Sequence, residues 1–502
     1  MRPLPDDGPL SWVAALGITL VAGLLRFWHL SQPRGKMFDE IYYACDSQSL
    51  LKHGVEVALK GDQACTPKSP IEPGFVVHPP FGKWIIGLGQ SLFGYNETGW
   101  RVMSALLGTL TVLVLIRAAR RLFGSTLLGC VAGLLLALDG MAFVFSRTAL
   151  LDGILTFFVV VAFACLVADR DDGRRRLADR LEADPEGAAS GRGPRLGFRW
   201  WRLGAAVALG LACSVKWSGV YFLALFPLLS YAWDLSARRA AGISQAWVAA
   251  LRRDALPAVA LFFVLAPLVY LATWTGWFMA DAHHAWDRDF AQTYNDHWFG
   301  VPDALRSWVH YHHAILQFHT GLHSHHPYQS HPLGWLVLAR PVAFFYTAPK
   351  FGELGCTSAT AGCSREVLGI GTPAIWWASI PALVLMAWYW VSRRDWRAAT
   401  FLLCFLVGFV PWIFSDLDHR TMFNFYALPL VPFMVLAITY VLGRVIGPAD
   451  ADDGRRTWGA VAAGAYVLLV VLNFFYLYPV LVGEVIPYEH WHKLMWLGNN
   501  WI

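Results

Sequence analysis

The chain has 502 residues, of which 56% are hydrophobic and only 15% are charged, and its net charge is +5. Its mean hydropathy is +0.43. Because soluble domains carry roughly a quarter charged residues, this composition excludes an ordinary soluble protein and indicates an all-α polytopic membrane protein. The small net charge gives no reason to expect a nucleic-acid partner.

Eleven segments are apolar over the length of about 20 residues that a membrane helix needs. The stretch 201–235 is interrupted by Lys216, and we interpret it as two helices joined by a tight turn near Ser214–Gly219. A single kinked helix is the alternative, and it would invert the topology of everything downstream. The predicted spans lie near 11–30, 101–119, 124–144, 149–168, 201–215, 217–235, 255–277, 373–392, 398–415, 424–443 and 457–478.

Arginine placement predicts the orientation of these spans, because cytoplasmic loops attract basic residues. The segments near 117–121, 169–200, 238–253, 393–397 and 444–456 all carry arginines, and the predicted spans place them on one side. We therefore expect a multi-pass plasma-membrane protein with a cytoplasmic N-terminus and an extracytoplasmic C-terminus. The first span lacks a following cleavage site and is predicted to be a signal anchor. The polar segment 169–200 is predicted to be a flexible linker, whose start could form a short amphipathic helix.

Two long segments, 31–98 and 278–370, then lie outside within a single membrane domain that spans 1–502. Each contains two cysteines, and an oxidising exterior would permit a disulfide in each. The candidate pairs are Cys45–Cys65 and Cys356–Cys363.

The first external segment opens with Asp39 and Glu40, directly after a hydrophobic span. Charges beside a membrane helix are costly, so such carboxylates tend to be functional. Farther along, Pro80–Leu92 shows apolar residues near helical spacing and predicts an interfacial helix. This helix would keep the segment, and the two carboxylates, close to the lipid headgroups. The motif that opens it contains His78, Pro79, Pro80 and Lys83.

Basic residues recur at the same predicted depth, namely Arg101, Arg147 and Lys216, and Arg420 lies in a later external turn. Several cations near a carboxylate suit a phosphorylated lipid, because cations hold the phosphate and the carboxylate takes a proton. Structural ion pairs are the alternative. Arg101 or Arg147 could pair with Asp39, Glu40 or Asp152, and for Arg420 we slightly favour a pair with Asp416 or Asp418.

The second external segment is rich in histidine, which raises the hypothesis of a metal site. The run His323-Ser324-His325-His326 lacks the cysteine or carboxylate ligands that structural zinc sites usually have. We therefore favour interfacial packing and polar contacts, and we expect no metal ligands. The other histidines are His283, His284, His297, His310, His312, His313, His319 and His331.

Several separated blocks of the chain resemble the protein O-mannosyltransferases, and most closely their actinobacterial members. The blocks are Phe38-Asp39-Glu40, His78–Lys83, Arg147–Asp152, Lys216–Gly219 and Met422–Pro429. The resemblance implies a GT-C glycosyltransferase fold with eleven membrane helices. It also implies inverting transfer of mannose from a polyprenyl-phosphate carrier to Ser or Thr of exported proteins. The family's acidic pair falls on Asp39 and Glu40, and its arginine at the second helix falls on Arg101.

The chain departs from the eukaryotic members at two places. They carry an acidic residue before the His-Pro-Pro run, where this chain has Val76-Val77, and they insert a β-trefoil MIR domain for which 278–370 is too short. We expect Asp39 to act as the general base and Glu40 to orient the acceptor or a cation. The leaving phosphate is already anionic, so cations suffice and no obligatory cofactor is expected, with an unrecognised divalent ion as the alternative.

The expected partners are the lipid donor, secreted Ser/Thr-containing acceptors and membrane lipids, with the secretion channel as a further candidate. A GT-C transferase that acts on a lipid or glycan, such as an aminoarabinose or arabinose transferase, is the first alternative. A transporter is the second, but the sequence shows no internal repeat, and its charges gather at one external face.

Overall fold

The computed structural model describes residues 8–61, 65–184, 191–281, 284–296, 298–448 and 450–501. Among these residues, nine helices are long and apolar enough to cross a membrane, and two shorter apolar helices, α5 (Thr126–Ala137) and α9 (Trp200–Val215), accompany them. Each of the eleven predicted spans therefore has a helix. The nine are α1 (Pro9–Phe27), α4 (Glu97–Phe123), α7 (Leu151–Ala183), α10 (Gly219–Ala240), the composite helix Ala246–Thr273, α18 (Pro373–Arg393), α19 (Trp396–Leu417), the composite Asn424–Ile446 and α21 (Asp453–Val482).

The composite helices have local causes. Ala246–Thr273 passes through α11 (Ala246–Ala249), the π-helical turn η1 (Ala250–Ala255), α12 (Leu256–Ala260), the π-helical turn η2 (Leu261–Leu265) and α13 (Ala266–Thr273). Pro257 and Pro267 each follow one of these wide turns. Proline lacks an N–H and clashes with the preceding turn, so the helix widens there. Asn424–Ile446 joins the 3₁₀ turn η3 (Asn424–Leu430) to α20 (Val431–Ile446). In its most apolar stretch of 18 residues, 89% is buried inside the protein, so this helix lies at the centre of the bundle.

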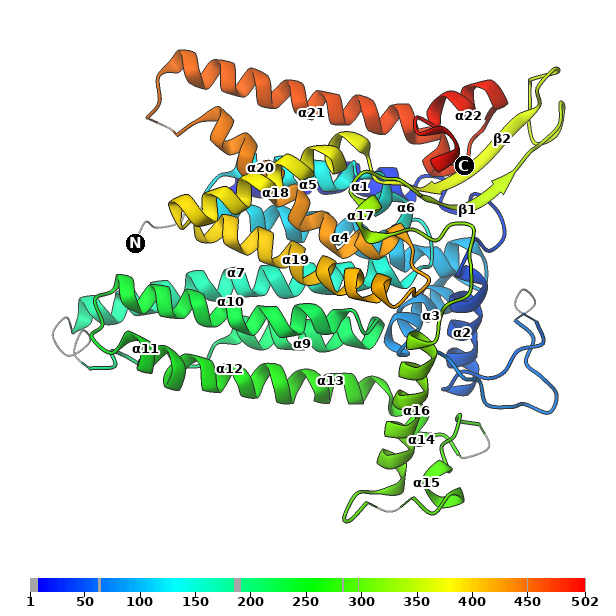
Figure 1. Cartoon of the computed structure of the whole chain (residues 1–502), viewed down its shortest axis with the longest axis horizontal. Helices are drawn as coiled ribbons and strands as arrows, with labels where there is room; N and C mark the ends of the chain where they lie inside the picture. Colours follow the sequence, from blue (N-terminus) through cyan, green and yellow to red (C-terminus); the bar gives the residue numbers. More distant parts are fainter. Residues whose placement is uncertain are drawn as a thin grey trace.

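The helices run side by side, and the two chain ends lie at opposite ends of the bundle (Figure 1). The turn between α9 and α10 falls at Lys216–Ser218, so the two-helix interpretation of 201–235 is confirmed. Gly219 makes this tight turn possible, because a Cβ there would lie 2.8 Å from the backbone of Ala212. Within the predicted span 124–144, Asp139 caps the short helix α6 (Gly140–Phe145) and separates it from α5.

The rest of the chain gathers at the end of the bundle that holds Lys216. The first external segment forms α2 (Glu40–His53) and α3 (Phe81–Phe93), and α3 matches the predicted interfacial helix. The second forms α15 (Phe290–Thr293), α16 (Asp303–Thr320), α17 (Pro332–Trp335) and an antiparallel hairpin, after α14 (Thr275–Met279). The hairpin strands β1 (Val342–Thr347) and β2 (Cys363–Gly369) pair with β3 (Val485–Pro487) in a small sheet that the sequence did not predict. The C-terminal segment adds α22 (Tyr488–Leu494) and a 3₁₀ turn, η4 (Gly498–Asn500).

Both expected cysteine pairs form disulfides in the structure, Cys45 with Cys65 and Cys356 with Cys363. The first ties α2 to the loop that follows it, and the second closes the hairpin between β1 and β2.

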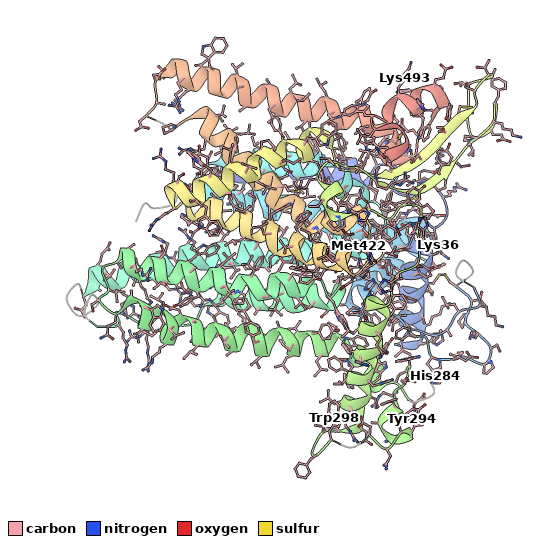
Figure 2. The ribbon with its side chains drawn as sticks, viewed as in Figure 1. Lys36, His284, Tyr294, Trp298, Met422 and Lys493 are labelled. Atoms are coloured by element: carbon pink, nitrogen blue, oxygen red, sulfur yellow. A yellow bond between two sulfur atoms is a disulfide. The ribbon has the colours of Figure 1, made fainter. Side chains whose placement is uncertain are left out.

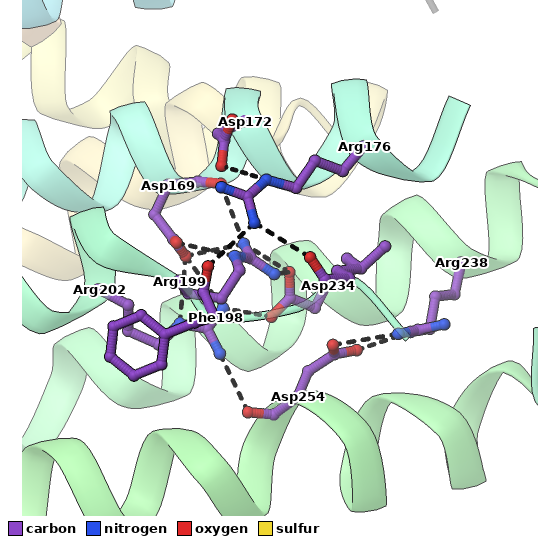
Figure 3. Close-up of polar contacts among 10 residues, drawn as sticks. Asp169, Asp172, Arg176, Phe198, Arg199, Arg202, Asp234, Arg238 and Asp254 are labelled. Atoms are coloured by element: carbon purple, nitrogen blue, oxygen red, sulfur yellow. Dashed lines mark hydrogen bonds and ion pairs between the residues drawn. The ribbon is translucent and has the colours of Figure 1, made fainter. Parts of the chain in front are cut away.

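The prediction that 169–200 is a flexible linker is wrong for its first half, because α7 continues without a break to Ala183. The cause is a buried charge cluster at the start of α9, the end of that helix opposite Lys216, and Figure 3 shows its contacts. Asp169 of α7 accepts from Arg199 at 2.8 Å and from Arg202 at 3.0 Å, and Asp234 of α10 accepts from Arg202 at 2.6 Å. Arg238 of α10 donates to Asp254 of η1 at 2.6 Å.

These six side chains comprise three arginines and three aspartates, and all are buried. Their charges balance, and each carboxylate accepts at least two hydrogen bonds. An uncompensated charge in such a place is far more costly than the pair, so every member fixes the position of the others. The cluster therefore locks α7, α9, α10 and η1 together at this end.

Replacing Asp169 by Asn leaves Arg199 and Arg202 with less buried countercharge, and we expect it to destabilise the protein by about 3–5 kcal/mol. Thermal unfolding of the purified protein in detergent measures this as a lower midpoint. The control is Glu182→Gln at an exposed position near the end of the same helix, which should leave the midpoint unchanged. Equal midpoints for the two variants would contradict a locking role.

Candidate active site

A cavity of about 1510 Å³ opens at the end of the bundle that carries the two long external segments. Its walls come from α2, the α9–α10 turn, α13, α16 and the segment before η3. Four acids, three cations and several histidines line it, together with many aromatic side chains. The charged and histidine residues are Asp39, Asp46, Asp152, Asp418, Lys83, Lys216, Arg420, His78, His312, His319, His323 and His326.

Asp39 stands at the N-cap position of α2, yet its side chain makes no capping hydrogen bond. The carboxylate faces the cavity instead. The preceding Phe38 adopts a positive φ of 48°, a conformation that costs energy for a non-glycine residue. Its ring is held against Phe344 and Phe425, with centroids 5.1 and 5.8 Å away. Aromatic packing thus fixes the backbone that presents Asp39.

Burial raises the pKa of Asp39 to about 6. The Lys216 ammonium opposes this rise, the Asp152 carboxylate adds to it, and a hydrogen bond with Tyr43 opposes it. A carboxylate with this pKa is ionised at pH 7 and is a stronger base than an exposed aspartate.

Lys216 and Asp152 form a bidentate pair on the same wall. The Lys216 ammonium donates to both carboxylate oxygens of Asp152 at 2.9 Å, and it lies 5.1 Å from the centre of the Tyr426 ring. Asp152 comes from the first turn of α7, and Lys216 ends α9 in an extended conformation. Since an ammonium carries three N–H donors, one remains for a ligand in the cavity.

Arg420 is the other cation that the structure brings to this cavity from the predicted set. Its Nε donates to the His319 carbonyl at 2.9 Å, while Asp416 accepts from His331 instead. The favoured ion pair of Arg420 with Asp416 or Asp418 is therefore replaced by a contact with α16. The Arg420 Nη1 atom is buried without a hydrogen-bond partner among the described residues. A buried guanidinium donor left open at a cavity wall is suited to an anionic ligand.

His319 and His78 stack face to face beside Arg420, with ring centroids 5.2 Å apart. The His319 Nε2 lies 2.8 Å from the Val77 carbonyl, which can only accept, so Nε2 carries the proton and Nδ1 faces Arg420 Nη2 at 3.5 Å. Burial lowers the pKa of His319 to about 4 and that of His78 well below its usual value. Both rings are therefore neutral at pH 7.

Lys83 lines the cavity and lies next to two acids. Its ammonium lies 2.5 Å from Glu56 and 3.7 Å from Asp46, and its side chain is buried. The other residues of the motif that contains Lys83 shape the start of α3 and allow it to pack closely. Pro79 and Pro80 precede α3, with Pro80 at its N-cap, and a Cβ on Gly82 would lie 2.7 Å from Leu151 and 3.0 Å from Val215. Gly82 thus lets α3 pack directly against the start of α7, which carries Asp152, and against the end of α9, where Lys216 lies.

Glu40 and Arg101 do not line the cavity. The Glu40 side chain is fully buried and accepts from Arg101 Nε at 2.9 Å and from Arg101 Nη2 at 2.8 Å. It also accepts from the backbone N–H groups of Ala149 and Met37, each at 2.9 Å. The Nη1 and Nη2 groups of Arg101 also donate to backbone carbonyls of the segment 30–35. The expectation of a phosphate contact for Arg101 is corrected, and Glu40 becomes a positioning residue.

Arg147 likewise lies outside the cavity. Its Nη1 donates to the carbonyls of Arg26 at 2.8 Å and Trp28 at 2.6 Å, and its Nη2 donates to His29. These carbonyls end α1, where a helix has unpaired acceptors and a negative dipole end. Arg147 therefore caps the first membrane helix and is not a phosphate ligand in this arrangement.

A second polar group on the cavity wall was missed by the sequence analysis. Trp217 Nε1 donates to the Tyr270 hydroxyl at 2.9 Å, and that hydroxyl lies 2.7 Å from His312 Nε2. His312 Nδ1 donates to the Trp308 carbonyl at 2.8 Å, so Nε2 is the acceptor. Trp217 follows Lys216 in a recognised block, but Tyr270 sits inside an apolar span and gave no signal. Asp46 and Glu56 were also missed, because they stand in unremarkable sequence.

Most described histidines of the second external segment pack on aromatic rings or bond to backbone and aspartate groups, as His312, His319 and His331 do. Among the described residues, no group of three or more His, Cys, Asp or Glu side chains could hold a metal ion. His283 and His297 lie outside the described residues.

The comparisons with known proteins agree along the whole chain. A family model described as dolichyl-phosphate-mannose-protein mannosyltransferase matches residues 16–253, and one described as the C-terminal four TMM region of protein-O-mannosyltransferase matches 304–501. A polyprenol-phosphate-mannose–protein mannosyltransferase of Mycobacterium tuberculosis (strain CDC 1551 / Oshkosh) is 41% identical, over 99% of this chain and 94% of the relative. The chain belongs to the protein mannosyltransferase family. The corresponding Corynebacterium glutamicum protein is 35% identical over 96% of this chain and 92% of its own length.

Solved structures show the same architecture at low sequence identity. The Saccharomyces cerevisiae protein O-mannosyltransferase Pmt1-Pmt2 complex bound to the sugar donor superposes with a TM-score of 0.73 at 14% identity, over 99% of this chain and 93% of that chain. ArnT from Cupriavidus metallidurans bound to undecaprenyl phosphate gives 0.50 at 17%, over 94% and 72%. The fold is the predicted GT-C fold. In its described residues, 278–370 forms helices and a hairpin, as expected for a member without a MIR domain.

Replacing Glu40 by Gln removes the countercharge of a fully buried arginine, and we expect a loss of about 3–5 kcal/mol of stability. The measurement is the unfolding midpoint in detergent. The control is Glu72→Gln, which breaks the ion pair of two half-exposed side chains, Lys68 and Glu72, and should cost about 1 kcal/mol or less. If Glu40→Gln unfolded like Glu72→Gln, the pair with Arg101 would not hold this site together.

Proposed function

We propose that this protein transfers mannose from polyprenyl-phosphate mannose to Ser or Thr hydroxyls of exported proteins. The proposal is supported by the relatives' names at high coverage and by one observation in the cavity. Asp39, the Lys216–Asp152 pair and the open donor of Arg420 all line the same space. A base and two cations in one cavity match the needs of a hydroxyl attacking a sugar phosphate.

Asp39 would take the proton of the acceptor hydroxyl as it attacks the anomeric carbon. Hydroxyls are weak nucleophiles at neutral pH, and a positioned base lowers this barrier. A single displacement inverts the anomeric centre and needs no second carboxylate as nucleophile. Glu40 is withdrawn into its pair with Arg101, so it is not available for that role.

Lys216 and Arg420 would hold the phosphate that departs from the sugar. Charge grows on the phosphate oxygens as the glycosidic bond breaks, so preorganised cations stabilise the transition state more than the ground state. The Lys216–Asp152 pair keeps the ammonium fixed in place. The proposed reaction therefore requires no cofactor.

The active site would face the extracytoplasmic side of the plasma membrane, where exported acceptors pass. Arginine-rich turns lie at the opposite end of the bundle, and cytoplasmic loops attract such charge. Acceptors delivered by the secretion channel would enter the cavity from this side.

The transfer rate should rise with pH through about 6, because only the ionised Asp39 carboxylate accepts a proton. Asp39→Asn should lower kcat by about 10²–10⁴-fold while donor binding persists, since that is the usual contribution of a positioned base. Mannosylation of a Ser/Thr-rich peptide by reconstituted protein, followed from pH 5 to 8, measures both effects.

The control for this profile is Asp46→Asn, because burial also raises the pKa of Asp46 to about 6. This variant should keep the acid limb. If Asp46→Asn abolished the limb and Asp39→Asn kept it, Asp46 would be the base. Transfer to a lipid acceptor but not to the peptide would favour the other class of GT-C transferase.

Arg420→Gln should raise KM for the donor about tenfold or more, because a charged hydrogen bond contributes about 1.5–3 kcal/mol. The acceptor KM should change much less. Arg34→Gln provides the control, as Arg34 is an exposed cation on the same side. A rise confined to the acceptor KM would assign Arg420 to acceptor binding instead.

A further inference from the structure

The segment 274–320 forms a lateral arm with its own small hydrophobic core. That core is separate from the core of the membrane bundle and contains Trp274, Trp277, Ala285, Tyr311 and Ile315, together with Val55. The Tyr311 hydroxyl also accepts a hydrogen bond from the Val76 N–H group of the first external segment, at 3.1 Å. The arm is therefore a packed unit anchored at its base.

The direction of the arm is set by α16. This helix runs across the axes of the membrane helices, at the level where α9 and α13 end, and it extends beyond the edge of the bundle (Figure 1). Its 18 residues correspond to about 27 Å at 1.5 Å per residue. An element with this direction and depth lies along the membrane surface.

The outer end of the arm carries the most exposed aromatic side chain of the described residues. Phe299 is 107% exposed, and its neighbour Trp298 is 47% exposed. Gly300, with φ of 71°, follows and turns the chain back toward α16. Figure 2 shows Trp298 on the side of the arm that faces the membrane-helix ends, whereas Tyr294 and His284 lie on its other side. The tip thus points toward the bilayer and not toward bulk water.

We propose that the tip formed by Trp298 and Phe299, hereafter the arm tip, inserts into the membrane leaflet on the cavity side. Its ligand is the phospholipid surface at the boundary between headgroups and acyl chains. Aromatic side chains favour this boundary, where an apolar ring is buried beside a polar zone. Of the five aspartates in the arm, Asp287 and Asp303 are paired with His310 and Arg306, so these two oppose insertion less than free charges would.

A protein partner fits the arm tip less well. Two aromatic side chains bury about 150–250 Å² each, whereas a stable protein interface needs about 800 Å² per partner. A lipid surface requires no such area, because it adds to an anchorage that the membrane helices already provide.

The proposal has a consequence for the cavity and does not depend on the transferred group. The base of α16 supplies His312, Leu316 and His319 to the cavity wall, and the arm tip precedes the start of the same helix. Lipid contact at the tip would therefore hold one end of a rigid helix whose other end shapes the cavity.

The test is a depth measurement on the full chain. Phe299→Cys is labelled with an NBD fluorophore and reconstituted into nanodiscs of phosphatidylcholine and phosphatidylglycerol. Phe351→Cys is the matched control, because Phe351 is 64% exposed at the turn of the β1–β2 hairpin, which points away from the bundle (Figure 1). The unsubstituted chain, labelled in parallel, gives the background of the native free cysteines. Both substituted positions are exposed, so folding is preserved.

We expect lipids with a nitroxide on the upper acyl chain to quench the Phe299 label at least about threefold more than the Phe351 label. Aqueous iodide should show the reverse order. Iodide quenching of the Phe299 label equal to that of the Phe351 label would overturn the proposal. Protection of the Phe299 label from both quenchers would also overturn it, since the arm tip would then be covered by protein.

Discussion

The active site depends on one buried ion pair, Glu40 with Arg101. These residues are 61 positions apart, and the pair joins the start of α2 to the start of α4. The Ala149 N–H adds a third contact from the segment before α7. Both side chains are fully buried, so water solvates neither charge, and removing one partner leaves a large penalty. Asp39 is attached to this fixed point, and its own carboxylate faces the cavity, since the contacts with Arg101 and Ala149 are made by Glu40.

Adjacent acids thus acquire opposite properties from their surroundings. Glu40 meets a guanidinium and two backbone N–H groups, which hold it as a structural anion. Asp39 meets a buried cavity wall and a cation that Asp152 already neutralises in large part. Burial then raises the pKa of Asp39 toward neutrality, which is the property that a base needs. Glu40 therefore holds the loop in place, whereas Asp39 accepts the proton.

Hydropathy and arginine spacing predicted the helices and the turn at Lys216, because the length of a membrane span is fixed by the bilayer. They predicted the place of Asp39, Lys216 and Arg420 near one face, since loops of one side must meet there. They could not distinguish Arg101 and Arg147 from Lys216, because all three cations lie at similar predicted depth. Only the contacts decide which guanidinium is used up by carbonyls and carboxylates and which retains an open donor. The sheet was missed because β3 pairs with β2 from a segment 120 residues away, a separation that no local pattern reveals.

The same contrast explains how the two ends of the bundle divide their tasks. At one end, three arginines and three aspartates neutralise each other completely, and nothing is left for a ligand. At the other, Lys216 keeps one donor beyond its bidentate pair, and Arg420 Nη1 has no partner among the described residues. Unpaired polar donors at the cavity destabilise the protein until an anion binds. The rigid, charge-balanced cluster at the other end of the bundle helps to offset this cost. The energy needed to hold these donors open comes from helices that are fixed elsewhere, and the site is preorganised for that reason.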